Sequence, residues 1–378
     1  MIAIIVLSVL LVLVVLLLLL PYLISFLDQI QRFHIGKWSS EEIWKIAINK
    51  CAAKWLILLP YERVEGKYYP VKRYMKTVQH WQYAGLLLGL SEATIMNNTM
   101  VITKWRSNYL TEYGEWRTPQ NKVDFALLGY AVLKSTPDIS TIRPAMDWII
   151  LMLKNHICSD KMISYSQGNT ATIRYVDTLA MVCPFLAAYA KAYQEPALYE
   201  LAFTQLRTYR QYGLYADSEV PYHAYDSQTG LPASALGWGR GVVWYTLALI
   251  DTYLELPNGN QKTELANWIR SAADYYLQFQ REDGGFSSLI HIKTTPYDSS
   301  TTAGMAYFYK QCFLLFDEPA YRVALIRCHK KLKSVTMQNG AVDQCQGDTI
   351  GLANFSSCFS TLPFAQGLTL RSFIQEKE

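Results

Sequence analysis

The chain has 378 residues, of which 51% are hydrophobic and 17% are charged, so its composition supports a large packed core and argues against intrinsic disorder. The net charge is +4 without a basic run, and no nucleic-acid partner is therefore expected. The seven cysteines contain no Cys-x-x-Cys pair, which excludes the usual zinc-site spacings and gives no disulfide framework.

The N-terminus begins with a long apolar run, residues 2–27, that contains no charged side chain. A helix needs about 20 such residues to cross a bilayer. No basic residue precedes the run, and bulky side chains follow Pro21, which is untypical of a cleavable signal peptide. We therefore expect a single-pass transmembrane anchor over 1–28, with the membrane as partner and location. Arg32 and Lys37 follow the run and favour, on only two charges, a cytoplasmic side for the rest of the chain.

The segment after the anchor, 29–70, is predicted to be a helical connector. Its stretch "SSEEIWKIAINKCAAKWLILL" offers serines that can cap a helix and two glutamates that suit a first turn. Beyond it, apolar residues recur at helical spacing between short breaks rich in Gly, Pro, Asn and Ser. The predicted helices cover about 75–95, 120–135, 142–154, 176–192, 196–212, 237–255, 261–280, 299–316, 319–334 and 350–376.

This succession of helices predicts an all-α domain over 71–378. Consecutive helices with brief connections pack as antiparallel pairs, which stack either into an open solenoid or into a closed ring. No fixed repeat length of the common solenoids occurs. We therefore expect an (α/α)6 barrel, or toroid, preceded by the single N-terminal transmembrane helix.

The first acid of interest stands in "TPQNKVDFALLGYAVL", residues 118–133. Pro119 is typical of a helix start, and Asp124 would lie about one turn further on. Asp124 then shares a helix face with Leu128 and Ala131. A charge on an apolar face is costly unless it is paired or lines a cavity. Asp124 is thus either a buried, hydrogen-bonded carboxylate or part of a site.

A second acid, Asp177, opens the apolar stretch "RYVDTLAMVCPFLAAY", residues 174–189. Pro184 cannot donate a backbone hydrogen bond inside a regular helix, so we expect a kink or a new helix there. Both outcomes place Asp177 in an end turn. Burial favours the protonated form of a carboxyl, which would suit a proton donor. The alternative is that Asp177 caps the helix.

The stretch "PYHAYDSQTGLPASALGWGRGVVWYTLALI", residues 221–250, begins as a loop and continues as a buried helix. His223 lies in the loop, and Trp238, Arg240 and Trp244 open the helix. An arginine fork suits a carboxylate, and an indole offers a flat face to a sugar. These side chains are therefore candidates for ligand binding, although each type alone is more often structural.

Several of these stretches occur together in one known family. Asp124 ahead of an apolar helix, "RYVDTLAMVCPFLA", "HAYD", "WGRGVVW" and "YDSSTTAG" follow one another in this order. From about residue 74 onward, the chain resembles the unsaturated glucuronyl and rhamnogalacturonyl hydrolases, which are glycoside hydrolase families 88 and 105. The resemblance implies an (α/α)6 barrel that uses neither a metal nor another cofactor.

The resemblance also implies a reaction and a substrate. The enzymes of this family act on oligosaccharides that polysaccharide lyases leave with a C4=C5 double bond in the terminal uronic acid. An acid protonates C4, water adds at C5, and the hemiketal opens to release the next sugar. Asp177 matches the proton donor that then acts as base, and Asp124 matches a second acid that orients the sugar. The matching substrate contacts are His223, Trp238, Arg240 and Trp244.

One departure from the family pattern leaves two alternatives. The family commonly has Gly-Asn-Gly-Trp after the arginine, whereas this chain has Gly-Val-Val-Trp at 241–244. The valines remove an amide and are expected to add bulk near the pocket. A glycan-binding protein without activity is therefore one alternative. The other is an inverting glycosidase on the same toroid, which needs two carboxyls about 6.5–9.5 Å apart.

Overall fold

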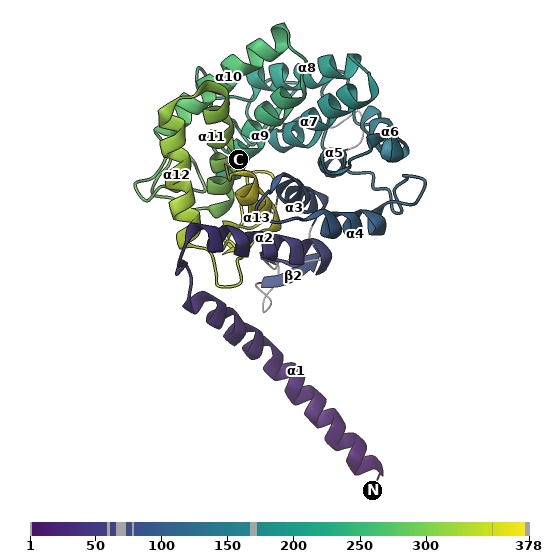
Figure 1. Cartoon of the computed structure of the whole chain (residues 1–378), viewed down its shortest axis with the longest axis vertical. Coiled ribbons are helices and arrows are strands. Elements are labelled where there is room, and N and C mark those ends of the chain that lie inside the picture. The colour runs from purple at the N-terminus through teal and green to yellow at the C-terminus, as the bar shows by residue number, and fades with distance from the viewer. Residues whose placement is uncertain are drawn as a thin grey trace.

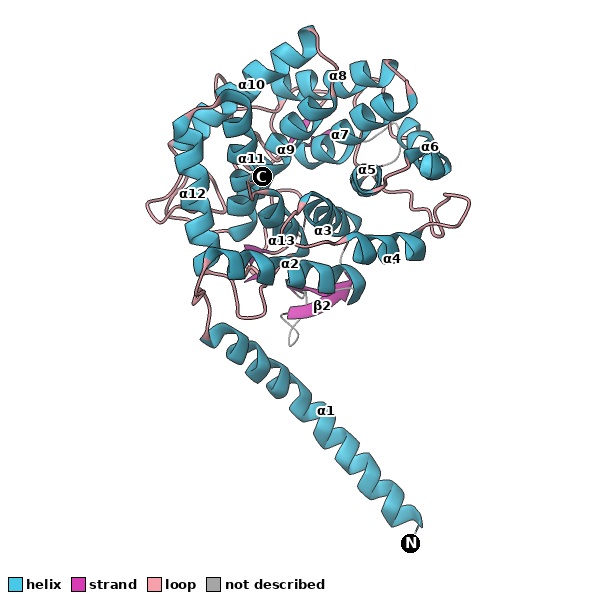
Figure 2. Ribbon diagram, viewed as in Figure 1, coloured by secondary structure: helices cyan, strands magenta, loops and turns pink. Residues whose placement is uncertain are grey.

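Helices that are apolar around their whole circumference lie at the centre of the structure. The structure, a computed structural model, describes residues 2–58, 61–65, 73–77, 79–166, 172–349 and 351–374. Thirteen α-helices and six short strands lie within these ranges (Figures 1 and 2).

Six buried helices form a closed inner ring. Each inner helix contacts the next one along the chain, and the last contacts the first. These helices are α3 (His80–Glu92), α5 (Asp124–Ser135), α7 (Val176–Tyr193), α9 (Gly239–Glu255), α11 (Ser299–Phe316) and α13 (Pro363–Arg371). One outer helix separates each pair in the chain, so the inner helices run in the same direction and begin at the same end of the ring.

Six further helices cover the ring from outside, each burying one face. In α6, the buried positions Ala145, Met146, Ile149, Met152 and Leu153 recur at helical spacing and point inward. The outer helices are α2 (Glu41–Leu58), α4 (Thr99–Tyr109), α6 (Arg143–Lys154), α8 (Ala197–Tyr212), α10 (Asn260–Leu277) and α12 (Pro319–Ser334). Although α2 comes early in the chain, it packs against both α3 and α13.

Three small antiparallel sheets interrupt the helices, so the fold is mostly helical but not all-α as predicted (Figure 2). Strand β1 (Tyr61–Glu65) pairs with β2 (Arg73–Thr77), and β5 (Cys345–Gln346) pairs with β6 (Phe359–Ser360). Strand β3 (Ile173–Tyr175) pairs with β4 (Ala224–Asp226), which brings the start of α7 beside the segment that precedes α9.

The predicted membrane anchor over 1–28 is contradicted. Residues 2–28 belong to α1 (Ile2–Phe33), a helix that extends away from the ring (Figure 1). The described leucines and valines of this helix are exposed. Within the described part of the chain, no helix combines the length and apolar character that a bilayer crossing requires. The single-pass anchor, the membrane partner and the membrane location are thus corrected.

The helix predictions differ from the structure mainly in loop-rich regions. The helix predicted over 350–376 is only α13, because a turn and β6 precede it, and α4 lies where no helix was predicted. The predicted division into a connector over 29–70 and a domain over 71–378 stays a prediction, and its boundary lies outside the described residues.

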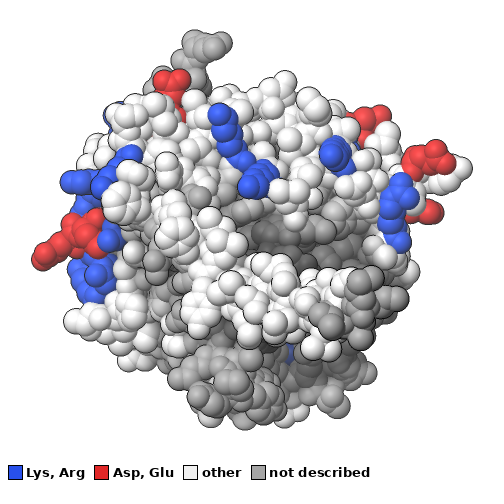
Figure 3. All heavy atoms as spheres, turned by 90° about the horizontal axis from the view of Figure 1, so that it is seen from below, with Lys and Arg blue, Asp and Glu red and all other residues white. Residues whose placement is uncertain are grey.

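Charged side chains on the face seen from below lie mainly around its edge, with both signs next to each other (Figure 3).

A buried ionic cluster lies at the carboxyl-terminal ends of the inner helices. Arg371 donates from Nη1 and Nη2 to the two oxygens of Asp251, at 2.9 and 2.8 Å. The Tyr307 hydroxyl donates to Asp251 at 2.6 Å, and Glu92 lies 2.9 Å from Arg371. The cluster ties α3, α9, α11 and α13 together opposite the end where they begin.

This cluster predicts a large effect of a single substitution on stability. Arg371→Met leaves the buried Asp251 without its counter-ion and should lower the free energy of unfolding by about 3–5 kcal/mol. Urea unfolding followed by circular dichroism measures the change. Arg322→Met, at an exposed position of α12, is the control and should change stability by less than about 1 kcal/mol. Equal losses in the two variants would contradict the assigned role of the cluster.

Candidate active site

A cavity of about 330 Å³ lies at the end of the ring where the inner helices begin. Its polar and aromatic walls come from the first turns of α3, α7 and α9 and from the loops that precede or face them. The lining residues are Gln79, Trp81, Tyr165, Ser166, Tyr175, Asp177, Met181, His223, Trp238, Arg240, Trp244, Asp348, Thr349, Gly351 and Leu352. A size of this order suits one or two sugar units.

The β3–β4 sheet places Asp177 beside His223. Tyr175 pairs with Ala224, and the Val176 N–H donates to the carbonyl of His223 at 3.0 Å. Asp177 follows in the first turn of α7, and its Oδ2 lies 3.7 Å from Nε2 of His223. The Asp177 side chain is 16% exposed, and its Oδ1 has no hydrogen-bond partner among the described residues. A carboxyl at the cavity wall thus has one oxygen near an imidazole and one without a protein donor.

The expectation that Asp177 lies in an end turn agrees with the structure, but one of the two outcomes expected at Pro184, a new helix, is not observed. No second helix begins near Pro184, because α7 continues through this residue to Tyr193. Asp177 lies in an end turn because the helix itself begins at Val176, directly after strand β3. Its side chain does not cap the helix, since the residue before the helix is Tyr175.

Asp124 lies behind the cavity wall and is not a lining residue. It is the first residue of α5, so the helix begins five positions later than Pro119 suggested. The side chain is 2% exposed, and neither oxygen has a hydrogen-bond partner among the described residues. Nδ1 of His80, the first residue of α3, lies 3.6 Å from Asp124 Oδ2. A buried carboxyl without hydrogen bonds is costly, which is typical of a site kept for function.

The phenol of Tyr165 shows that several acids share one neighbourhood. Burial raises the pKa of this phenol above its ordinary value. The negative charges of three carboxylates add to the rise, those of Asp124, Asp177 and Asp348. Such charges act strongly only at short range, so the two predicted catalytic acids lie in the same region of the ring. The phenol stays protonated and can donate a hydrogen bond.

The four predicted substrate-binding residues all line the cavity. The rings of His223 and Trp238 have centroids 4.7 Å apart, and the Arg240 guanidinium lies 4.8 Å from the Trp238 ring. Arg240 is 1% exposed and donates to the carbonyls of Gln346 and Gly347, at 2.6 and 2.8 Å. Part of its hydrogen-bonding capacity is therefore used on a loop of the protein.

The two valines that depart from the family pattern do not fill the cavity. Val242 and Val243 are fully buried, and neither is a lining residue, whereas Trp244 is. Val243 packs against Gly304 of α11, in the contact between two inner helices. The expected bulk near the pocket is therefore absent, because these positions face the packed interior of the ring.

Sequence analysis missed several lining residues because they stand in loops. Gln79 precedes α3, and its Nε2 donates to Oδ2 of Asp348 at 2.5 Å across the cavity. Tyr165 and Asp348 are separated from the predicted acids by many residues, and helical spacing gives no information about them. The helix predicted over 350–376 covered the lining residues Gly351 and Leu352, and Asp348 lies in a loop just before it. In the described part of the chain, no group of three or more His, Cys, Asp or Glu could hold a metal ion.

The family model for Glycosyl Hydrolase Family 88 matches residues 63–355, more than half of the chain. This match confirms the resemblance found in the sequence. The match ends within the loop that lines the cavity, and it contains both acids and all four predicted binding residues.

Solved structures share the fold at low sequence identity. A possible member of the GH105 family from Salmonella enterica serovar Paratyphi A has a TM-score of 0.74 at 15% identity, covering 89% of this chain and 93% of that chain. A family 105 glycoside hydrolase from C. acetobutylicum has a TM-score of 0.68 at 18% identity, with coverage of 77% and 92%. An unsaturated glucuronyl hydrolase from Bacillus sp. GL1, responsible for the degradation of glycosaminoglycan, has a TM-score of 0.60 at 14% identity, with coverage of 86% and 93%.

The contact of Val243 with Gly304 can be tested by a pair of substitutions. A Cβ added at Gly304 would lie 2.3 Å from Cγ1 of Val243, so Gly304→Ala should cost about 1–3 kcal/mol of stability through overpacking. Val243→Ala in the same chain removes the clashing methyl groups. The double variant should therefore be more stable than the two single losses together predict, as measured by urea unfolding. Strict additivity would contradict the assigned contact.

Proposed function

The chain belongs to glycosyl hydrolase family 88 and is a glycoside hydrolase, and we propose that it removes a C4=C5 unsaturated uronic acid from the non-reducing end of oligosaccharides. The observation that carries this proposal is the carboxyl of Asp177, which lines the cavity beside the imidazole of His223. The proposed substrates are fragments left by polysaccharide lyases, since these enzymes create the double bond.

The first step is protonation of C4 by Asp177. The double bond joins C4 to C5, and the ring oxygen on C5 makes it a vinyl ether, so a proton on C4 leaves positive charge shared by C5 and the ring oxygen. Nε2 of His223 lies 3.7 Å from Oδ2 of Asp177, and Oδ1 is buried without a hydrogen-bond partner among the described residues. Such an acid typically contributes a factor of about 10²–10⁴ to the rate.

The second step is addition of water at C5. Asp177 has given up its proton and now accepts one from the attacking water, which restores the acid. The product is a hemiketal at C5, and its opening gives a ketone and frees the following sugar. The same carboxyl thus serves as acid and then as base, and no bond to the protein forms.

The remaining site residues support binding of an anionic sugar. The first turns of α3, α7 and α9 line the cavity, and helix N-termini carry partial positive charge that favours a carboxylate. Arg240 adds a permanent positive charge, and the indoles of Trp238 and Trp244 form part of the cavity wall. Asp124 is proposed to orient the sugar from behind the wall, through small movements that bring its unpartnered oxygens into contact.

A second candidate function is inverting hydrolysis of a saturated glycoside. Asp348 lines the cavity together with Asp177, so two carboxyls are present in one pocket. Turnover of saturated glycosides with inversion, observed by NMR, would select this candidate. The alternative of a glycan-binding protein without activity loses its main support, because the two valines lie away from the cavity.

The proposed acid can be tested with lyase-generated disaccharides, whose conjugated alkene absorbs ultraviolet light. Wild-type protein should remove this absorbance, and Asp177→Asn should lower kcat by at least about 100-fold because an amide cannot donate the proton. Asp283→Asn makes the same change at an ion pair with Lys331, outside the cavity, and should leave kcat unchanged. Undiminished turnover by Asp177→Asn, with the native circular dichroism spectrum, would refute the assignment.

The proposed role of Asp124 predicts a smaller loss. Asp124→Asn retains the size of the side chain but removes its charge, and kcat/KM should fall by at least about tenfold, the scale of one hydrogen bond to a charged group. Steady-state kinetics on the same disaccharides measure this effect. A kcat/KM equal to that of the wild type would show that Asp124 is only a structural residue.

A further inference from the structure

Gln346 is a buried residue at the end of β5 that none of the motifs in the sequence includes. It is 6% exposed and lies at the point where the chain leaves β5 for the loop that lines the cavity. Its backbone N–H, its backbone carbonyl and both polar atoms of its side chain take part in hydrogen bonds. Two of these four bonds come from residues proposed to bind substrate.

The backbone of Gln346 is fixed between two charged side chains. Its N–H donates to Oδ1 of Asp298 at 2.9 Å, and its carbonyl accepts from Nη1 of Arg240 at 2.6 Å. Asp298 is fully buried and also accepts from the N–H groups of Ser300 and Thr301, so it is anchored to the first turn of α11. The position of this peptide is therefore set by two inner helices, α9 and α11.

The side chain of Gln346 connects Trp238 to the loop. Its Oε1 accepts from the indole Nε1 of Trp238 at 3.0 Å, and its Nε2 donates to the carbonyl of Ser356 at 2.9 Å. The ring of Phe355 is stacked on the other side of Trp238, with centroids 5.2 Å apart and an interplanar angle of 20°. The indole is thus held at its edge by an amide and over its face by the loop.

We propose that Gln346 is a positioning residue that fixes the Trp238 indole in the wall of the cavity. This inference deepens the proposed function and rests on it, because it assigns the geometry of the same wall. Arg240 takes part by holding the carbonyls of Gln346 and Gly347, directly before the lining residues Asp348 and Thr349. Gln346 itself is not a lining residue and acts on the substrate only through Trp238 and this loop.

Two substitutions separate the tether to Trp238 from the other contacts. Gln346→Met keeps the length of the side chain and the backbone bonds but loses the acceptor for the indole N–H. Gln346→Glu keeps an acceptor for the indole N–H, loses the donor to Ser356 and adds a negative charge. If the hydrogen bond from Gln346 positions the Trp238 indole, Gln346→Met should raise KM by about tenfold, which is the scale of one hydrogen bond. The kcat of this variant should stay within about twofold of the wild type.

The Glu variant should lie closer to the wild type in KM than the Met variant does. Equal increases in KM for the two variants, or no increase in the Met variant, would overturn the proposal. A merely structural role would lower stability and leave KM of the folded enzyme unchanged, and this distinguishes the two explanations.

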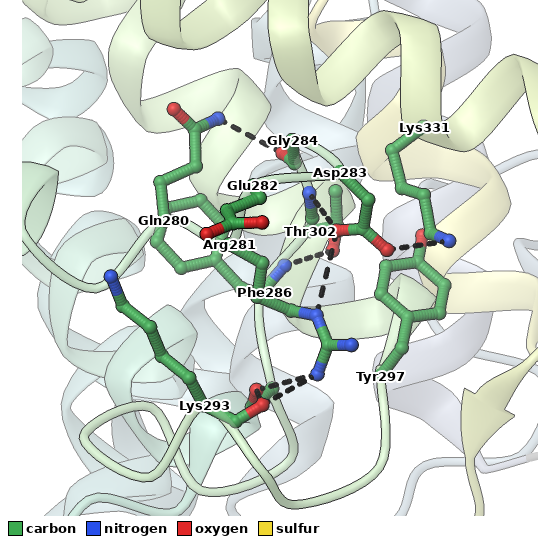
Figure 4. Close-up of polar contacts among 12 residues, drawn as sticks. Gln280, Arg281, Glu282, Asp283, Gly284, Phe286, Lys293, Tyr297, Thr302 and Lys331 are labelled. Carbon is green, nitrogen blue, oxygen red and sulfur yellow. Dashed lines mark hydrogen bonds and ion pairs between the residues drawn. The ribbon is translucent and has the colours of Figure 1, made fainter.

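Gln280 provides a matched control elsewhere in the ring. It is also 6% exposed, and its Nε2 donates to the carbonyl of Gly284 at 2.9 Å (Figure 4). The same Nε2 donates to the carbonyl of Ala324 at 2.9 Å. Figure 4 shows its surroundings, the turn in which Arg281, Asp283 and Lys331 meet, and none of these residues lines the cavity. Gln280→Met should lower the thermal midpoint and leave KM unchanged. A rise in KM equal to that of Gln346→Met would contradict the proposal.

A second measurement keeps this inference separate from the proposed reaction. In the full chain, the indole N–H of Trp238 gives a ¹⁵N–¹H NMR signal that can be assigned with Trp238→Phe. Its exchange with solvent should be slow in the wild type and in Gln346→Glu, and faster in Gln346→Met. If the wild type turns over no unsaturated disaccharide, the proposed function fails while this test still decides the tether. Equal exchange in all three proteins would overturn it.

Discussion

The structure depends on the close contact between the backbones of α3 and α13, where the ring of inner helices closes. A Cβ on Gly89 would lie 2.5 Å from the carbonyl oxygen of Gly367, and a Cβ on Gly367 would lie 1.9 Å from that of Gly85. Real Cβ atoms do not approach so closely, so Gly89 and Gly367 require glycine. The first and last inner helices of the chain can meet only because their backbones touch here, and α2 then covers the junction from outside.

Closure determines where the chemistry is located. Because all six inner helices begin at one end, residues that open these helices converge there even when they are far apart in the chain. Asp124, Asp177 and Arg240 each lie in a first turn, and the loops before and after the helices complete the wall. The helix N-termini offset part of the negative charge that the acids bring together. The opposite ends are tied by the buried pair of Arg371 and Asp251, which leaves the open end for a ligand.

The sequence was informative wherever a side chain stands at a helix start. The family and its glycosidase class follow from such stretches, and the positions of Asp177, His223 and Trp238 at one cavity agree with their order in the chain. Periodicity predicted a helix over 350–376 and gave no information on Gln346 and Asp348, because the contacts of these two residues come from distant parts of the chain. The apolar character of α1 led to the incorrect expectation of a membrane anchor.

The account depends on one chemical event, the transfer of a proton from Asp177 to C4 of an unsaturated uronic acid. The most direct measurement is the reaction of an unsaturated disaccharide in D₂O, analysed by NMR at early times. The account predicts one deuterium at C4 of the released product, placed on one face, and no cleavage of the matching saturated disaccharide. A product without deuterium at C4, or equal cleavage of the saturated sugar, would contradict it.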